Sequence, residues 1–106
     1  MKRLGFLLLF IFIICSHLFA ENLDTINNRV IKLFKQESYS NCYNLAKDLY
    51  SLSKEADDTT LVFNSLYYMG FSNQRMGNME KAIDYNMRAY EVSQSLQRLD
   101  LQSSIL

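Results

Sequence analysis

Apolar residues recur at spacings of three and four along most of the chain after residue 22. This period is that of an amphipathic helix, in which such positions share one face. The pattern predicts four helices, over residues 23–36, 39–52, 61–77 and 79–92. We therefore expect an all-α fold in which each helix buries one apolar stripe.

The breaks between these segments carry the residues that begin and end helices. Ser38, Asp58 and Asn78 precede the second, third and fourth segments, and their side-chain oxygens can accept hydrogen bonds from free backbone amides of a first helical turn. Gly77 suits the left-handed residue that closes a helix. Only a few residues separate the segments, which predicts antiparallel packing of successive helices.

A repeat of about forty residues relates the second segment to the fourth. Cys42 corresponds to Ala82, Leu49 to Ala89 and Tyr50 to Tyr90. The recurrence of tyrosine at these two positions, forty residues apart, favours a packing role for both rings. The same shift carries Leu61 to Leu101, so the last residues have the pattern of a third helical pair. A period of 20–50 residues is typical of stacked-repeat architectures.

The stretch from Tyr67 to Val92 resembles the tetratricopeptide repeat, in which pairs of antiparallel helices stack into an α-solenoid. Gly70 and Ala82 stand where small residues let two helices approach, and Gly77 stands at the turn. The resemblance gives structural repeat positions to six residues. They are Leu66, Met69, Gly70, Gly77, Ala82 and Ala89.

The resemblance divides the chain into a first repeat over 23–56, a second over 63–96 and a third that starts at 100–106 and is truncated. Asn73 and Asn86 replace usual aromatic residues, and Gln94 replaces a terminal proline. Without that proline the second helix of the pair is expected to run on towards Leu96, which would lengthen the usual period to about forty. Similar long repeats occur in exported sensor regions of bacterial regulators.

Residues 1–20 are expected to form a signal peptide. Lys2 and Arg3 precede a nearly continuous apolar stretch that ends at Ala20, before Glu21. An uncleaved membrane anchor is the alternative, because Leu18 occupies a position where small residues precede cleavage. Lipid attachment at Cys15 is disfavoured by Ile14. In each case the remaining chain is exported, and it either lies in the periplasm or faces it from a membrane anchor.

Charge and composition exclude several classes of function. Removal of residues 1–20 leaves two more acidic than basic side chains, so no basic face for nucleic acid is expected. His17, the single histidine, lies in the leader, so no base, metal site or cofactor site is predicted. Cys42 is expected to be a core thiol, and the Asp57–Asp58 pair to complement a helix dipole. No enzymatic activity is therefore predicted.

The resemblance implies that the first helix of each pair lines a groove that takes a protein or peptide partner. The residues carried over by position are Asn64, Tyr67, Phe71, Gln74 and Arg75, with Asn27, Ile31, Phe34 and Lys35 as first-repeat counterparts. Tyr67 and Phe71 share one helix face and can form a stacking surface. The alternative is that these two rings pack against the neighbouring repeat. A clamp for a terminal carboxylate is not expected.

Two functions follow as hypotheses. The first is a protein-interaction module in the N-terminal part of a larger exported signalling or regulatory protein. The second is a structural envelope protein without a separate ligand, which self-associates through the apolar residues 101–106.

Overall fold

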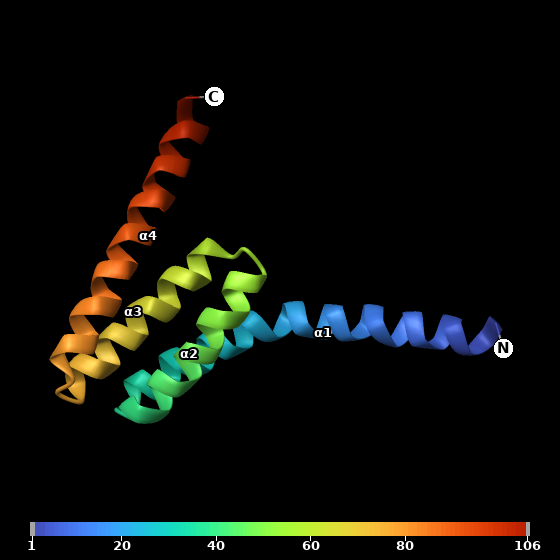
Figure 1. The fold of residues 1–106 in the computed structure, drawn as a ribbon, viewed down its shortest axis with the longest axis horizontal. Helices are drawn as coiled ribbons and strands as arrows, with labels where there is room; N and C mark the ends of the chain where they lie inside the picture. The colour runs from blue at the N-terminus through green and yellow to red at the C-terminus, as the bar shows by residue number, and fades with distance from the viewer. Residues whose placement is uncertain (1, 106) are drawn as a thin grey trace.

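The computed structural model describes the backbone of residues 2–105 and the side chains of residues 3–11 and 23–99. Within this part the backbone forms four helices and no strand (Figure 1). They are α1 (Lys2–Lys35), α2 (Tyr39–Glu55), α3 (Thr59–Arg75) and α4 (Met79–Ile105). The prediction of an all-α fold is confirmed, and the helix ends fall within a few residues of the expected ones, except where α1 and α4 continue outward.

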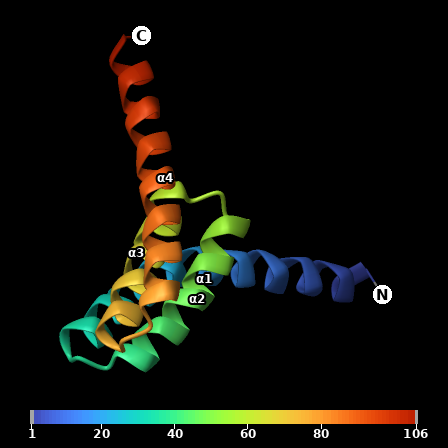
Figure 2. The same ribbon diagram turned by 60° about the vertical axis from the view of Figure 1, so that its left-hand side comes forward.

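Each helix packs against the next one in the chain, and α3 also packs against α1. The N-terminal half of α1 and the C-terminal end of α4 project away from this bundle in both views (Figures 1 and 2). α1 is one continuous helix that includes the expected leader. α4 continues through residues 100–105, where the repeat predicts a new pair, and the side chains of 100–106 lie outside the described residues.

The three connections between helices share one geometry at intervals of twenty residues. Glu37, Asp57 and Gly77 have φ values of 61°, 53° and 85°. In each turn the amide of this residue bonds to the carbonyl three residues back, and the next amide bonds to the carbonyl five residues back. This pair of bonds is the Schellman closure of a helix. The sequence predicts the left-handed residue only at Gly77, because the other two are not glycines.

The helix starts differ from one another in how their polar side chains are used. Asp58 accepts a hydrogen bond from the Leu61 amide at 3.1 Å, so the predicted cap of α3 is confirmed. The predicted cap at Ser38 is wrong: with ψ at 68°, its side chain makes no capping bond. Its hydroxyl oxygen instead accepts from Asn41 Nδ2 at 3.0 Å.

The fourth helix runs past Leu96 to Ile105, as the missing proline predicts, and the forty-residue period is divided equally between two helices. Both α2 and α3 are 17 residues long. Each helix and its connection occupy twenty residues, so two of them make one repeat.

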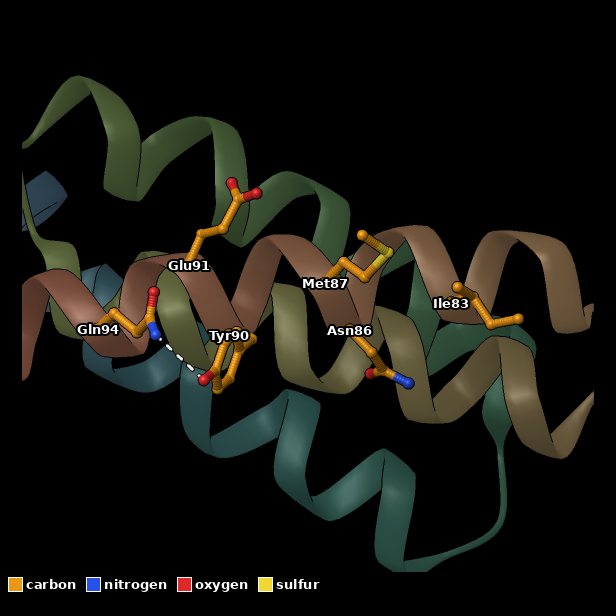
Figure 3. A pocket seen from close by; sticks show the side chains of 6 residues that line it. All are labelled: Ile83, Asn86, Met87, Tyr90, Glu91 and Gln94. Atoms are coloured by element: carbon orange, nitrogen blue, oxygen red, sulfur yellow. Dashed lines mark hydrogen bonds between the residues drawn. The ribbon is translucent and has the colours of Figure 1, made fainter.

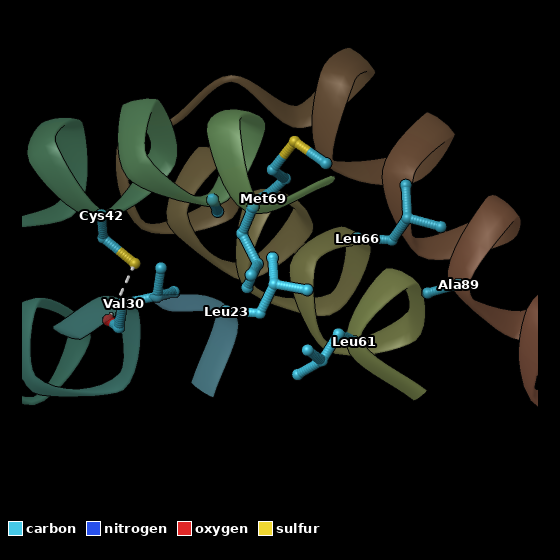
Figure 4. Packing of buried hydrophobic residues seen from close by; sticks show 9 residues of the cluster. Leu23, Val30, Cys42, Leu61, Leu66, Met69 and Ala89 are labelled. Atoms are coloured by element: carbon cyan, nitrogen blue, oxygen red, sulfur yellow. Dashed lines mark hydrogen bonds between the residues drawn. The ribbon is translucent and has the colours of Figure 1, made fainter. Parts of the chain in front are cut away.

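The hydrophobic core lies where α1, α2 and α3 meet and continues to the inner side of α4 (Figure 4). Its fully buried centre contains Val30, Cys42, Leu49, Leu66 and Met69. The Cys42 thiol donates to the Val30 carbonyl at 3.4 Å. Burial raises the pKa of this thiol, although the Ser72 hydroxyl beside it acts to lower it. Cys42 is thus a protonated packing residue.

Two asparagines occupy positions where the repeat usually has aromatic rings. The amide of the buried Asn73 donates to the Met69 carbonyl at 2.7 Å and accepts from Asn78 Nδ2 at 3.3 Å, which ties the end of α3 to its turn. A Cβ added at Gly70 would fall on Asn86 Oδ1 and lie 2.9 Å from Asn86 Cγ. Gly70 therefore makes room for a polar side chain of α4, which an alanine there would displace.

The shared turn geometry gives opposite expectations for exchanges of glycine. Gly77→Ala is expected to lower the free energy of unfolding by about 1 kcal/mol, because a Cβ is disfavoured at positive φ while nothing lies within 4 Å to clash with it. Glu37→Gly is expected to raise it by a few tenths of a kcal/mol to about 1 kcal/mol, after the entropy of glycine in the unfolded chain is subtracted. Urea denaturation followed by circular dichroism measures both.

Gln36→Gly is the matched control, because Gln36 is exposed but lacks a positive φ. It is expected to destabilise the protein. Equal effects of Glu37→Gly and Gln36→Gly would show that residue 37 is not held in the left-handed conformation.

Candidate protein-binding surface

Three of the predicted groove residues, Phe34, Tyr67 and Phe71, belong to a continuous layer of aromatic rings, which we call the aromatic surface. Its members come from α1, α2 and α3 and are Phe34, Tyr39, Phe63, Tyr67, Tyr68 and Phe71. The closest pair is Tyr67 and Phe71, whose ring centroids lie 4.7 Å apart one turn apart on α3. Ring pairs at such distances add attraction beyond the apolar area that they bury.

Phe34 of α1 joins the two sets of predicted residues. Its ring makes edge contacts with Tyr68 at 5.4 Å and Phe71 at 6.1 Å between centroids. Phe71 is therefore half-buried against the neighbouring helical pair, as the packing alternative expects. Tyr67 remains 39% exposed although it touches Phe63, Tyr68 and Phe71. One exposed ring thus packs against three neighbouring aromatic rings.

The other predicted groove residues differ from one another in exposure. Asn64, Asn27 and Ile31 are half-buried, whereas Gln74 is exposed. Lys35 and Arg75 are exposed and occupy the last residues of α1 and α3, where a cation complements the helix dipole. The aromatic surface therefore has a basic rim at the ends of these two helices.

A second group of side chains joins α2 to α4, and we call it the tyrosine–arginine clasp. It consists of Tyr43 and Tyr50 on α2 with Tyr85 and Arg88 on α4. The hydroxyls of Tyr43 and Tyr85 lie 3.0 Å apart, and Arg88 Nη2 donates to the Tyr50 hydroxyl at 2.7 Å. The Arg88 guanidinium also lies over the rings of Tyr50 and Tyr85, at 5.2 and 5.6 Å from their centroids. Cation–π contacts of this kind stabilise partly exposed pairs by about 0.5–1 kcal/mol.

The clasp shifts the pKa values of its two central tyrosines in opposite directions. The hydrogen bond with Tyr43, together with burial, raises the pKa of Tyr85 to about 12. At Tyr50 burial acts to raise the pKa, but Lys54 and Arg88 outweigh it and lower the pKa below the ordinary value.

The outer face of α4 was not expected to be exposed. The periodicity places Ile83 and Tyr90 in the buried stripe of this helix, but they are 56% and 63% exposed. The predicted packing role holds for Tyr50, which is half-buried in the clasp, and is wrong for Tyr90. Ile83 and Tyr90 line an open groove of about 530 Å³ together with Asn86, Met87, Glu91 and Gln94 (Figure 3). The apolar positions of α4 span too wide an arc to be covered by α3 alone.

Comparisons with protein-family models, with curated proteins and with solved structures found no match to this chain. The resemblance to the tetratricopeptide repeat therefore rests on the residues themselves. Of its positions, Leu66, Met69, Gly70, Ala82 and Ala89 are buried, and Gly77 forms the turn.

Within the described residues, no three His, Cys, Asp or Glu side chains are grouped so that they could hold a metal ion. None of the helices, as far as its described residues go, has an apolar stretch long enough to cross a membrane. Within the described part of the expected leader, seven residues of α1 expose large apolar side chains. They are Leu4, Phe6, Leu7, Leu8, Leu9, Phe10 and Ile11.

The raised pKa of Tyr85 predicts a loss of stability at alkaline pH. An unfolded tyrosine ionises at about 10, whereas folded Tyr85 stays neutral until about 12. Its stabilising contribution is complete below pH 10 and is lost as the pH rises from 10 through 12. A rapid pH jump followed by absorbance at 295 nm is expected to show one tyrosine ionising near pH 12.

Tyr43→Phe removes the partner hydroxyl but keeps the ring, so the pKa of Tyr85 is expected to fall towards its ordinary value. Tyr85→Phe assigns the signal by removing it. An unchanged late titration in Tyr43→Phe would contradict the role of the hydroxyl pair.

Proposed function

We propose that this protein is a non-enzymatic protein-interaction module that binds a segment of a partner protein on its aromatic surface. The observation that carries the proposal is Tyr67, which is 39% exposed and yet held by three neighbouring rings. A tyrosine fixed in this way offers apolar area and a hydroxyl group with little loss of side-chain entropy on binding. Tyrosines with these properties are enriched among residues that dominate binding energies.

The surroundings of Tyr67 indicate the chemistry of the bound segment. The rings of Phe63 and Phe71 favour apolar side chains in the partner. Lys35 and Arg75 at the rim favour an acidic residue at the end of the segment that lies near the C-termini of α1 and α3. The partner is thus a peptide or protein segment with apolar and acidic residues.

We also propose that the chain belongs to an exported bacterial protein, and that it forms the N-terminal part of a larger signalling or regulatory protein. The exposed apolar side chains of residues 4–11 support export, because nothing in the described part of the chain covers them. The resemblance to the long tetratricopeptide repeats of exported sensor regions supports the regulatory role.

Selection of binding peptides tests the aromatic surface. A random peptide library is displayed on phage and selected on the chain as purified from an expressing cell. Tyr67→Ala is expected to weaken binding of the selected peptides at least tenfold, as loss of a central aromatic residue costs about 2 kcal/mol or more. The control is Leu99→Ala, which removes an exposed apolar side chain of α4 that lies on neither the aromatic surface nor the groove of Figure 3, and it is expected to leave binding within twofold.

Circular dichroism confirms that both variants are folded before binding is compared. The proposal fails if no peptide is enriched, or if Tyr67→Ala and Leu99→Ala weaken the selected peptides equally.

Export is tested by the mass of the chain recovered from bacterial cells. We expect the mature chain to begin at Glu21 and to be found in the periplasmic fraction. Leu8→Arg introduces a charge into the apolar stretch and is expected to block processing, whereas Leu99→Arg, at an exposed leucine of α4, is the control that is processed normally. Recovery of the unprocessed wild-type chain in the cytoplasm would refute export, and recovery in the membrane would identify an anchor.

A further inference from the structure

The outer face of α4 is apolar and has no covering helix in the part of the chain that the structure describes. Met79, Ile83, Met87 and Tyr90 expose 53%, 56%, 61% and 63% of their surfaces. They follow one another at helical spacing, and the last three line the open groove of about 530 Å³ (Figure 3). An exposed stripe of this kind on one helix is typical of an interaction site.

The forty-residue repeat shows how the equivalent face of α2 is used. Ile83 and Tyr90 correspond by position to Tyr43 and Tyr50. In α2 these two residues are covered by another helix, because Tyr85 and Arg88 of α4 contact them through the clasp. The helix that covers this face thus presents an aromatic ring and an arginine three residues apart.

Tyr90 offers a partner arginine the same two groups that Tyr50 offers Arg88, an aromatic ring and a hydroxyl. Its ring is exposed, and among the described side chains its hydroxyl is bonded by the Gln94 amide, which donates to it at 3.1 Å. A guanidinium over this ring would reproduce the arrangement that Arg88 makes with Tyr50.

Acidic side chains border the apolar stripe on the side away from α3. Glu80, Asp84 and Glu91 are spaced by four and seven residues, so they share one side of the helix, and all three are exposed. Asp84 lies 4.0 Å from Arg88, while Glu80 and Glu91 form no ion pair with the described residues. This border attracts a partner with basic flanks.

The same charges disfavour a second copy of this chain as the occupant. An antiparallel pair of α4 helices related by a twofold axis would place the two acidic borders on the same side, where they repel each other. A folded second copy also has Tyr85 and Arg88 engaged in its own clasp.

We propose that the outer face of α4 binds an amphipathic helix of a partner protein, which has basic flanks and presents an aromatic ring and an arginine three residues apart. Its aromatic side chain fills the groove beside Ile83 and Met87, and its arginine lies over Tyr90. This site is separate from the aromatic surface and has the opposite charge preference.

A designed peptide tests the proposal. The probe is an 18-residue helical peptide with leucines on one face, lysines on both flanks and a Tyr-x-x-Arg pair in the leucine face. Its binding to the chain is measured by fluorescence anisotropy. Met87→Glu is expected to weaken binding at least about tenfold, and Glu91→Lys about threefold to tenfold. Both residues are exposed, so the fold is expected to persist.

Two controls separate this site from the aromatic surface. Tyr67→Ala is expected to leave peptide binding within twofold, whereas Tyr90→Ala is expected to weaken it. A matched peptide with glutamates in place of the lysines and the arginine is expected to bind at least about tenfold more weakly at low salt. If the proposed function is wrong, Tyr67→Ala will bind the phage-selected peptides as well as the wild type does. The results with the basic peptide would be unaffected.

Four outcomes would overturn the proposal: no saturable binding of the basic peptide, equal binding of the acidic peptide, no effect of Met87→Glu, or loss of binding in Tyr67→Ala. Sedimentation equilibrium of the chain alone adds a fifth. A dimer that Met87→Glu abolishes would assign the face to a second copy.

Discussion

The fold depends on three helix–helix turns that lie twenty residues apart and use the same backbone bonds. In each turn a residue with positive φ reverses the chain, and the carbonyl of the residue after it accepts the first amide bond of the next helix. Because the intervals are equal, successive helices start at the same helical phase. Leu49, Met69 and Ala89, each eleven residues after the cap position, are consequently all buried. A repeat of forty residues is therefore two equal units of twenty, and the phase of every buried stripe follows from the turns.

The sequence predicts the helices and most of their boundaries because two signals agree: the apolar period and the polar residues at the breaks. It does not predict the left-handed conformation of Glu37 and Asp57, because neither is a glycine and the backbone bonds of the turn, not the residue type, mark these positions. Ser38 shows the converse. Its residue type suits a cap, but its backbone angles turn the side chain towards Asn41 instead.

The sequence predicted three members of the aromatic surface, Phe34, Tyr67 and Phe71, but not Tyr39, Phe63 or Tyr68, and it did not predict how exposed each ring is. Tyr67 and Phe71 share a helix face by spacing alone, yet only the structure shows Phe71 against Phe34 while Tyr67 stays open. Periodicity likewise assigns Ile83 and Tyr90 to a buried stripe, since it detects an apolar face and not the presence of a helix to cover it. The long-range contacts of the clasp, such as Arg88 with Tyr50, carry no local sequence signal at all.

α4 differs from α2 in what covers its two sides. The two ends of the helical stack are therefore not equivalent. The inner side of α4 packs on α3 at Leu66 and Gly70 and reaches α2 through Tyr85 and Arg88, so it supplies the covering helix for the α2 face. Its outer side repeats the covered face of α2 without a described helix upon it. On α1, by contrast, Asp24, Asn28, Arg29 and Lys32 are exposed, and no large apolar stripe accompanies them in residues 23–35. Polar side chains close a stack, whereas an apolar stripe continues it. Further stacking of helices on this bundle is therefore directed to the α4 side, and a helix bound there would stabilise the folded stack by an amount that grows with the logarithm of its concentration divided by its Kd.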